Sequence, residues 1–207
     1  MEHYTVHTLP PHTEEKRIDW ASVPTAGITH FKWLSGYTPE SFAQLVYIPE
    51  TGFVLRMTSE ESHPRAVLTH DNDPVCTDSC LEFFADWLGD GRYINVEMNA
   101  NGTLLSYIGP DRFTRTPIVD LTGGETFPVT AEVKEKSWSV TAVIPERLIA
   151  RIYGTDTVPF RPGFTFHGNF YKCGDQTEIP HYGMWNPVTT EQPDFHVPSC
   201  FGELTIV

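Results

Sequence analysis

The chain has 207 residues, which is enough for one well-buried core and short for two domains. Its formal net charge of −13 disfavours nucleic acid and anionic membrane surfaces as partners, because their phosphate groups are also negative. With 17 prolines and 15 glycines spread along the chain, short strands joined by turns are favoured over long helices.

Residues 1–38 are polar and are interrupted early by a pair of prolines. We expect an irregular segment here, which packs through Trp20 and Trp33 onto the rest of a single domain spanning residues 1–207. No basic stretch is followed by an apolar run, so the sequence predicts no signal peptide and a cytoplasmic location, or secretion if a leader has been removed. No apolar run reaches the ~20 residues that span a bilayer, so no membrane segment is expected.

Strand-like runs follow along the rest of the chain. In residues 93–99 the side chains of Asn95, Glu97 and Asn99 share one face, and apolar side chains take the other. Similar runs occur at residues 41–48, 52–58, 79–84, 104–108, 126–133, 137–144, 163–171 and 201–207. Only residues 145–152 predict a helix, because they open with a proline, which suits a first turn. The sequence therefore predicts an all-β fold with two packed antiparallel sheets or a jelly roll, and at most one or two short helices.

Common catalytic signatures are missing from the sequence. It contains no GxSxG nucleophile turn, no HExxH pair and no phosphate-binding GxxxxGK loop. His167, His181 and His196 are scattered, and their spacing matches no reliable metal-ligand pattern. The four cysteines lack zinc-finger spacing, so we expect reduced and mostly buried thiols.

A cluster of oxygen-bearing side chains precedes the run at residues 79–84. Asp71, Asp73 and Asp78 are candidate ligands for calcium, which binds loop carboxylates. The alternative is a solvated turn, since Asp and Asn suit turn geometry. Within the following run, Glu82 interrupts apolar residues and therefore faces either solvent or a ligand.

Two further groups of polar residues are candidates for sugar contacts. Asn95 and Glu97 lie on one strand face and can both donate to and accept from hydroxyls, unless that face is simply solvated. Asn169, Lys172 and His181 lie near Trp185, whose indole could serve as a flat plate for a sugar ring. The alternative is that Trp185 belongs to the core.

Residues 78–86 (DSCLEFFAD) resemble a strand motif of family 9 carbohydrate-binding modules. The segments 168–175 (GNFYKCGD), 185–188 (WNPV), 193–198 (PDFHVP) and 201–204 (FGEL) are similar to the C-terminal half of stand-alone relatives of those modules. The resemblance implies an immunoglobulin- or DOMON-like β-sandwich with a sugar-binding cleft and structural calcium.

In this family two tryptophans clamp a terminal sugar, and the resemblance matches Trp185 to one of them and Glu82 to a nearby acid. The second tryptophan is expected shortly before Glu82, where the chain instead has residues 74–77 (PVCT). Trp33 or Trp87 could take its place.

Three functions remain open at this point. The leading hypothesis is non-catalytic binding of a mono- or oligosaccharide, held by Glu82, Asn95, Glu97, Asn169, Lys172, His181 and Trp185. A glycoside hydrolase or lyase that uses Glu82 and Glu97 as a carboxylate pair is the second. The third is an interaction module that has lost sugar binding.

Overall fold

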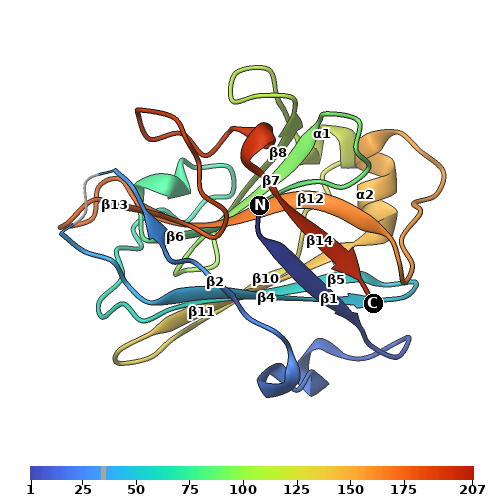
Figure 1. Cartoon of the computed structure of the whole chain (residues 1–207), viewed down its shortest axis with the longest axis horizontal. Coiled ribbons are helices and arrows are strands. Elements are labelled where there is room, and N and C mark those ends of the chain that lie inside the picture. Colours follow the sequence, from blue (N-terminus) through green and yellow to red (C-terminus); the bar gives the residue numbers. More distant parts are fainter. Residues whose placement is uncertain (34–35) are drawn as a thin grey trace.

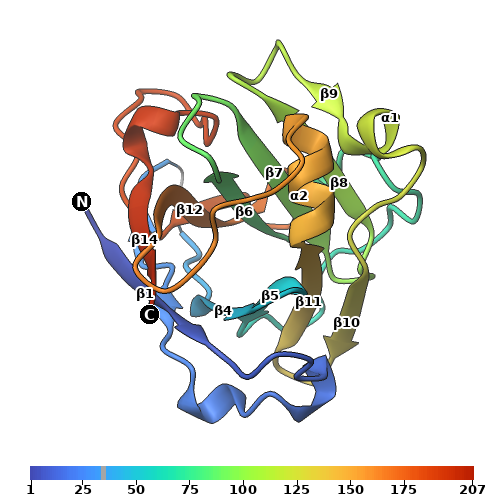
Figure 2. The ribbon, with the colours of Figure 1, turned by 90° about the vertical axis from the view of Figure 1, so that its right-hand side faces the viewer.

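A computed structural model describes residues 1–33 and 36–207, which contain 14 strands in one curled, mixed sheet and two short α-helices. Two halves of this sheet face one another as two layers (Figure 2). The mostly β fold with short helices confirms the fold class expected from the sequence. No helix in the described part of the chain is both long enough and apolar enough to cross a bilayer.

The first layer consists of four antiparallel neighbours. In spatial order they are β10 (Val129–Val133), β11 (Trp138–Pro145), β5 (Gly52–Ser59) and β4 (Ser41–Ile48). Alternate side chains of a strand point to the same side of the sheet, and in β11 the side chains of Trp138, Val140 and Ala142 all point into the core. This apolar face directs the layer toward the core. The short strand β2 (Ala26–Gly27) adds to the outer side of β4.

The second layer contains the longest strand of the described chain, β12. In spatial order it contains β14 (Gly202–Ile206), β12 (Thr165–Gly174), β6 (Cys80–Asp86), β7 (Tyr93–Asn99), β8 (Leu104–Gly109) and β9 (Thr116–Pro117). The C-terminal part of β12 also pairs with β13 (His181–Met184), which in turn pairs with β3 (His30–Phe31).

Strand β1 (His3–Thr8) joins the two layers. It runs parallel to β14 over His3–Val6 and then parallel to β4 at His7 and Thr8. The expectation of an irregular segment at residues 1–38 is therefore wrong for residues 3–8, and the parallel pairing of β1 departs from the antiparallel sheets expected from the sequence. The sequence signal for strand β1 is weak because only two of its residues, Tyr4 and Val6, are apolar and buried, while the others are polar.

The main core fills the space between the two layers. Aromatic side chains from both layers meet there: Phe53 of β5 lies 4.6 Å from Trp87, and Phe83 of β6 stacks on Phe170 of β12 at 4.7 Å between ring centroids. The helices α1 (Ile118–Thr122) and α2 (Glu146–Tyr153) pack at one end, and α2 matches the helix expected at residues 145–152.

The outer face of the second layer is covered as well. Residues Cys80 and Phe84 of β6 and Tyr171 of β12 point away from the main core into a second apolar cluster. Loops from distant parts of the chain rise over this face (Figure 1). A strand face that would otherwise be solvated is thereby enclosed.

Candidate functional site

A cavity of about 200 Å³ lies on the outer face of the second layer, over β6, β7 and β12, and we call it the outer pocket. Charged side chains make up much of its wall. They are Glu82, Glu97, Arg112, Arg115, Asp175 and Asp194. The remaining wall includes Cys76, Cys173, Tyr182, Phe195 and His196.

Two carboxylates form the base of the outer pocket. Glu82 of β6 and Glu97 of β7 are directly opposite in the antiparallel register and are 2% and 4% exposed. Burial raises the pKa of Glu97 to about 7, against the lowering effect of Arg115. Burial and, second, the charge of Glu97 raise the pKa of Glu82 well above its usual range. The pair therefore keeps a proton near neutrality and can both donate and accept hydrogen bonds.

Two arginines enter the pocket from the loop between β8 and β9. Arg115 places Nη1 3.8 Å from Oε1 of Glu97, and its guanidinium lies 4.9 Å from the ring centre of Tyr107. This Nη1 is buried and has no hydrogen-bond partner among residues 1–33 and 36–207. Arg112 lies 4.0 Å from Asp194 across the pocket. A buried donor without a partner is costly, so the Arg115 guanidinium is suited to an incoming acceptor.

One wall of the pocket is aromatic. Tyr182 of β13 and Phe195 have ring centres 6.3 Å apart, and Trp33 packs behind both at 6.2 and 6.1 Å. Burial and the neighbouring Asp175 raise the pKa of Tyr182 to about 12, so its hydroxyl stays protonated. An apolar ring face beside charged groups is the combination that a sugar requires.

His196 also lines the pocket. Its Nδ1 shares a hydrogen bond of 2.8 Å with the Tyr93 hydroxyl, and its ring lies 4.8 Å from that of Phe84. Burial lowers the pKa of His196 to about 3, with help from Arg115 and Arg112. The imidazole is therefore neutral at physiological pH.

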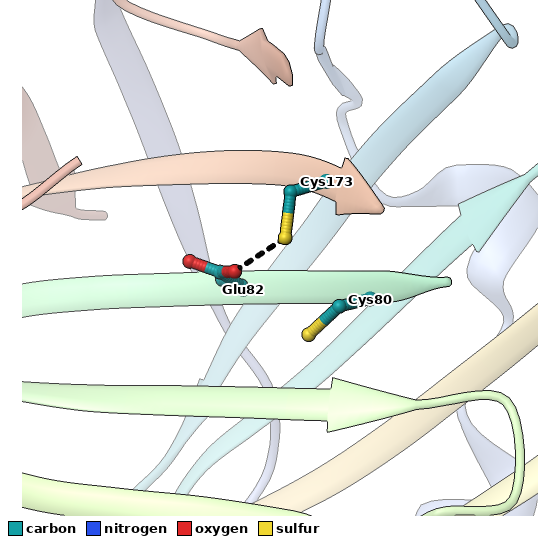
Figure 3. A group of neighbouring side chains, drawn as sticks. All are labelled: Cys80, Glu82 and Cys173. Atoms are coloured by element: carbon teal, nitrogen blue, oxygen red, sulfur yellow. Dashed lines mark hydrogen bonds between the residues drawn. The ribbon is translucent and has the colours of Figure 1, made fainter. Parts of the chain in front are cut away.

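Two thiols lie beside the carboxylate of Glu82. The Cys173 thiol donates a hydrogen bond of 2.8 Å to Oε1 of Glu82, and the Cys80 sulfur is near both (Figure 3). Burial raises the pKa of the Cys80 thiol to about 12. All four cysteines are free, as the sequence predicts.

Trp185 does not line the pocket, so the expectation that its indole forms a sugar plate is wrong. It is 6% exposed and belongs to the main core, where it packs edge-on against Phe170 at 5.5 Å and Tyr4 at 6.4 Å. A Cβ on Gly202 would collide with the Trp185 ring, so the indole covers this glycine. Trp87 is also in the core, at 1% exposure. The second tryptophan of the clamp is therefore not supplied by Trp87, and Trp33 contributes only from behind the aromatic wall.

Lys172 and His181 are likewise structural in this fold. Lys172 is fully buried and reaches the first layer, where its ammonium lies 3.2 Å from Glu61 and 5.8 Å from the Trp138 ring centre. It also donates a 2.7 Å hydrogen bond to Nε2 of His181. The ammonium of Lys172 is therefore paired inside the protein, and the ring of His181 is buried with it. The expectation that Lys172 and His181 bind sugar hydroxyls is wrong.

Asn169 and Asn95 differ in how their side-chain amides are hydrogen-bonded. Asn169 is fully buried and ties β12 to the backbone of Asn186, through a 2.8 Å bond to its carbonyl and a 2.9 Å bond from its N–H. It is therefore a structural link. Asn95 donates to Oε1 of Glu97 at 2.9 Å and so positions one carboxylate of the pocket, while its own Oδ1 has no partner in the part of the chain that the structure describes.

The three aspartates expected to bind calcium do not gather around a common point. Asp71 accepts from the Leu104 backbone N–H at 3.1 Å, whereas Asp73 accepts from His70 at 3.2 Å. Asp78 is fully buried and faces the Arg65 guanidinium at 3.3 Å. A guanidinium and N–H donors occupy the positions that a cation would need, so these residues do not fit a shared calcium site.

Sequence reasoning found Glu82 and Glu97 but missed the arginines of the pocket. A signal was present, because residues 111–115 (DRFTR) place two of only 14 basic residues in one short loop of an acidic chain. The sequence of residues 111–115 does not indicate which face of the sheet this loop covers. His167, His181 and His196 do not form a metal cluster in the described part of the chain.

Comparison with known proteins identifies a matching family for nearly the whole chain. The family model described as carbohydrate-binding family 9 matches residues 12–206. A protein from Bacteroides uniformis ATCC 8492, described as a candidate carbohydrate-binding protein, is 27% identical over 100% of this chain and 99% of its own, with a TM-score of 0.83. No curated protein matches the chain.

Two structures of a family 9 carbohydrate-binding module from Caldicellulosiruptor kristjanssonii share the fold. The glucose complex is 13% identical over 100% of this chain and 96% of that one, with a TM-score of 0.68. The cellotriose complex is 14% identical over 99% and 93%, with a TM-score of 0.65.

Proposed function

Because the chain belongs to carbohydrate-binding family 9, whose modules bind sugars without catalysis, we propose that the outer pocket is its sugar-binding site. The ligand is a single neutral pyranose unit, either free or at the end of an oligosaccharide. At about 200 Å³ the cavity is smaller than the ~300 Å³ at which pockets for drug-sized ligands begin, so it suits one sugar ring.

The observation that carries this proposal is a set of buried polar groups that face the cavity. Glu82 and Glu97 present carboxyl oxygens to it, and Nη1 of Arg115 is a donor with no acceptor among the described residues. Sugar hydroxyls donate and accept at once, so they can satisfy both kinds of group. The apolar face of the ring would lie against Tyr182 and Phe195, which replace the expected tryptophan clamp.

The related structures guide the choice of sugar. The Caldicellulosiruptor module was solved with glucose and with cellotriose. We therefore propose glucose and short β-glucans as first ligands of this chain, with binding at a chain end because the cavity holds one unit.

Isothermal titration with glucose and cellotriose tests the assignment of the pocket. Arg115→Met keeps the length of the side chain but removes its donors, so we expect at least a tenfold loss of affinity, since a hydrogen bond to a charged group contributes about 1.5–3 kcal/mol. Arg161→Met is the matched control, because Arg161 is exposed and outside the pocket. Equal affinity of both variants would remove Arg115 from the site, and no heat with either sugar would contradict the proposal.

A further inference from the structure

Cys80, Glu82 and Cys173 form a compact set of metal-ligating atoms. The two sulfurs and one carboxylate oxygen all lie within 4.8 Å of one another, and no other group of three or more His, Cys, Asp or Glu ligand atoms this close occurs in residues 1–33 and 36–207. Figure 3 shows the three side chains on neighbouring strands, with the Cys173 sulfur directed at the carboxylate. The set is separate from the aspartates expected to bind calcium.

The sheet holds these three residues in place. Cys80 of β6 is the direct antiparallel partner of Cys173 of β12, and Glu82 lies two residues further along β6 on the same face. Because the ligands come from two hydrogen-bonded central strands, their spacing does not depend on a loop. Rigid elements of this kind make precise ligand sites.

The donor set indicates the kind of ion. Two thiolates and one carboxylate suit a borderline or soft divalent cation such as Zn²⁺, whereas calcium prefers oxygen ligands alone. We propose that this chain binds one divalent ion of the zinc class through Cys80 Sγ, Cys173 Sγ and the carboxylate of Glu82. On binding, both thiols release their protons to solvent and the proton shared by the carboxyl pair stays on Glu97. The hydrogen bond between Cys173 and Glu82 is replaced by one bond from each of these residues to the metal.

An ion can reach this set through the outer pocket. Glu82 and Cys173 line the pocket although both are only 2% exposed, and Cys80 lies behind them. The carboxyl groups that line the same cavity, Glu82, Glu97, Asp175 and Asp194, outnumber its two guanidinium groups, Arg112 and Arg115, which favours entry of a cation. Three protein ligands leave the fourth position of a tetrahedral ion open toward the pocket, where water or a sugar hydroxyl can bind.

Titration of the metal-free chain with Cd²⁺ tests the proposal, because cadmium thiolates have an ultraviolet charge-transfer band, measured as a difference spectrum, that protonated thiols and the free ion lack. We expect a band that saturates at one equivalent and is displaced by Zn²⁺. Cys80→Ser and Cys173→Ser should each weaken Cd²⁺ binding at least tenfold. Cys200→Ser is the matched control, because Cys200 lies outside the set and should leave the titration unchanged.

Glu82→Gln separates the carboxylate from the thiols. It keeps both sulfurs, so a band should remain, but with at least tenfold weaker affinity. Circular dichroism and thermal melting establish that each variant is folded. The absence of a saturable band, or a band that survives both cysteine substitutions, would overturn the proposal, as would an unchanged affinity in Glu82→Gln. Sugar titration is a separate measurement, so failure of the metal site and failure of the sugar site can be told apart.

Discussion

At the scale of the residue, His181 illustrates how a buried network fixes a protonation state. Its Nδ1 hydrogen-bonds the Ile179 carbonyl at 2.8 Å, and its Nε2 accepts from the Lys172 ammonium at 2.7 Å. Burial lowers the pKa of His181 to about 4, and the Lys172 charge contributes, while Glu61 acts in the opposite direction. The ring of Tyr37 also faces it, at 5.1 Å. The folded chain thus requires the neutral imidazole.

We predict that this requirement destabilises the fold in mild acid. An unfolded histidine takes up its proton near pH ~6.5, whereas folded His181 does so only near pH 4. Between these values the unfolded chain binds more protons, so the free energy of unfolding falls as pH falls below ~6.5. In urea titrations, the stability advantage of the natural chain over His181→Gln should shrink by about 1–2 kcal/mol from pH 7 to pH 5.

An exposed histidine supplies the control for this measurement. The side chain of His12 is 80% exposed, so His12→Gln should follow the pH dependence of the natural chain. A constant difference between the natural chain and His181→Gln across this range would show that His181 does not hold a neutral state.

Single residues also show which parts of the candidate site can be predicted from the sequence. Glu82 was identifiable because an acid inside an apolar strand must face something other than the core, and it lines the pocket. The exposure of Trp185 was not identifiable, because it depends on Tyr4 and Gly202, which are distant in the sequence. The role of Arg115 likewise depends on how one loop folds back over a sheet.

At the scale of the element, the loop between β8 and β9 is held against the sheet by a close approach at Gly109. A Cβ at this position would collide with the Thr114 carbonyl and lie 2.7 Å from Cα of Arg115. The segment that carries both pocket arginines can therefore follow its path only if residue 109 has no side chain.

Gly109→Ala should accordingly weaken both sugar binding and the stability of the fold. We expect the loop to shift and the affinity for glucose or cellotriose to fall at least tenfold in a calorimetric titration, with about 1–3 kcal/mol lost from the free energy of unfolding. Gly36→Ala is the comparison, because a Cβ there meets no atom of the described residues within 4 Å. If the two variants bind sugar alike, the close approach does not position the arginines.

The elements themselves were predicted to different extents. β4 (Ser41–Ile48) and β7 (Tyr93–Asn99) coincide with the strands expected at residues 41–48 and 93–99, since long alternating runs carry a strong periodic signal. β13 (His181–Met184) and β3 (His30–Phe31) went unrecognised. They are short, and they exist because a neighbouring strand offers hydrogen bonds, which local sequence does not report.

At the scale of the whole molecule, strand β1 connects the two layers. Tyr4 and Val6 of this strand are buried in the main core, and the Tyr4 hydroxyl accepts a 2.9 Å hydrogen bond from the Leu45 backbone N–H. The other face of β1, with His3 and Thr5, is exposed. The two layers should therefore unfold together, and their coupling should depend on one face of this strand.

Paired alanine variants of the two faces test that coupling. Tyr4→Ala with Val6→Ala should cost about 4–6 kcal/mol, because two buried side chains are lost from the core. His3→Ala with Thr5→Ala, on the exposed face, should change stability by less than about 1 kcal/mol. Unfolding in urea, followed by tryptophan fluorescence and circular dichroism, should remain one transition in both. Similar losses for the two pairs, or separate transitions for the layers, would contradict this role of β1.

The pairing of β1 with β14 also sets an order of events during synthesis. Residues 3–6 leave the ribosome long before their partners at positions 203–206. Strand β1 must remain unpaired on that edge until β14 has been made, and contacts so distant in sequence form slowly. Closure of the fold should thus be a late step, and until then the open edge of β1 can pair with another chain.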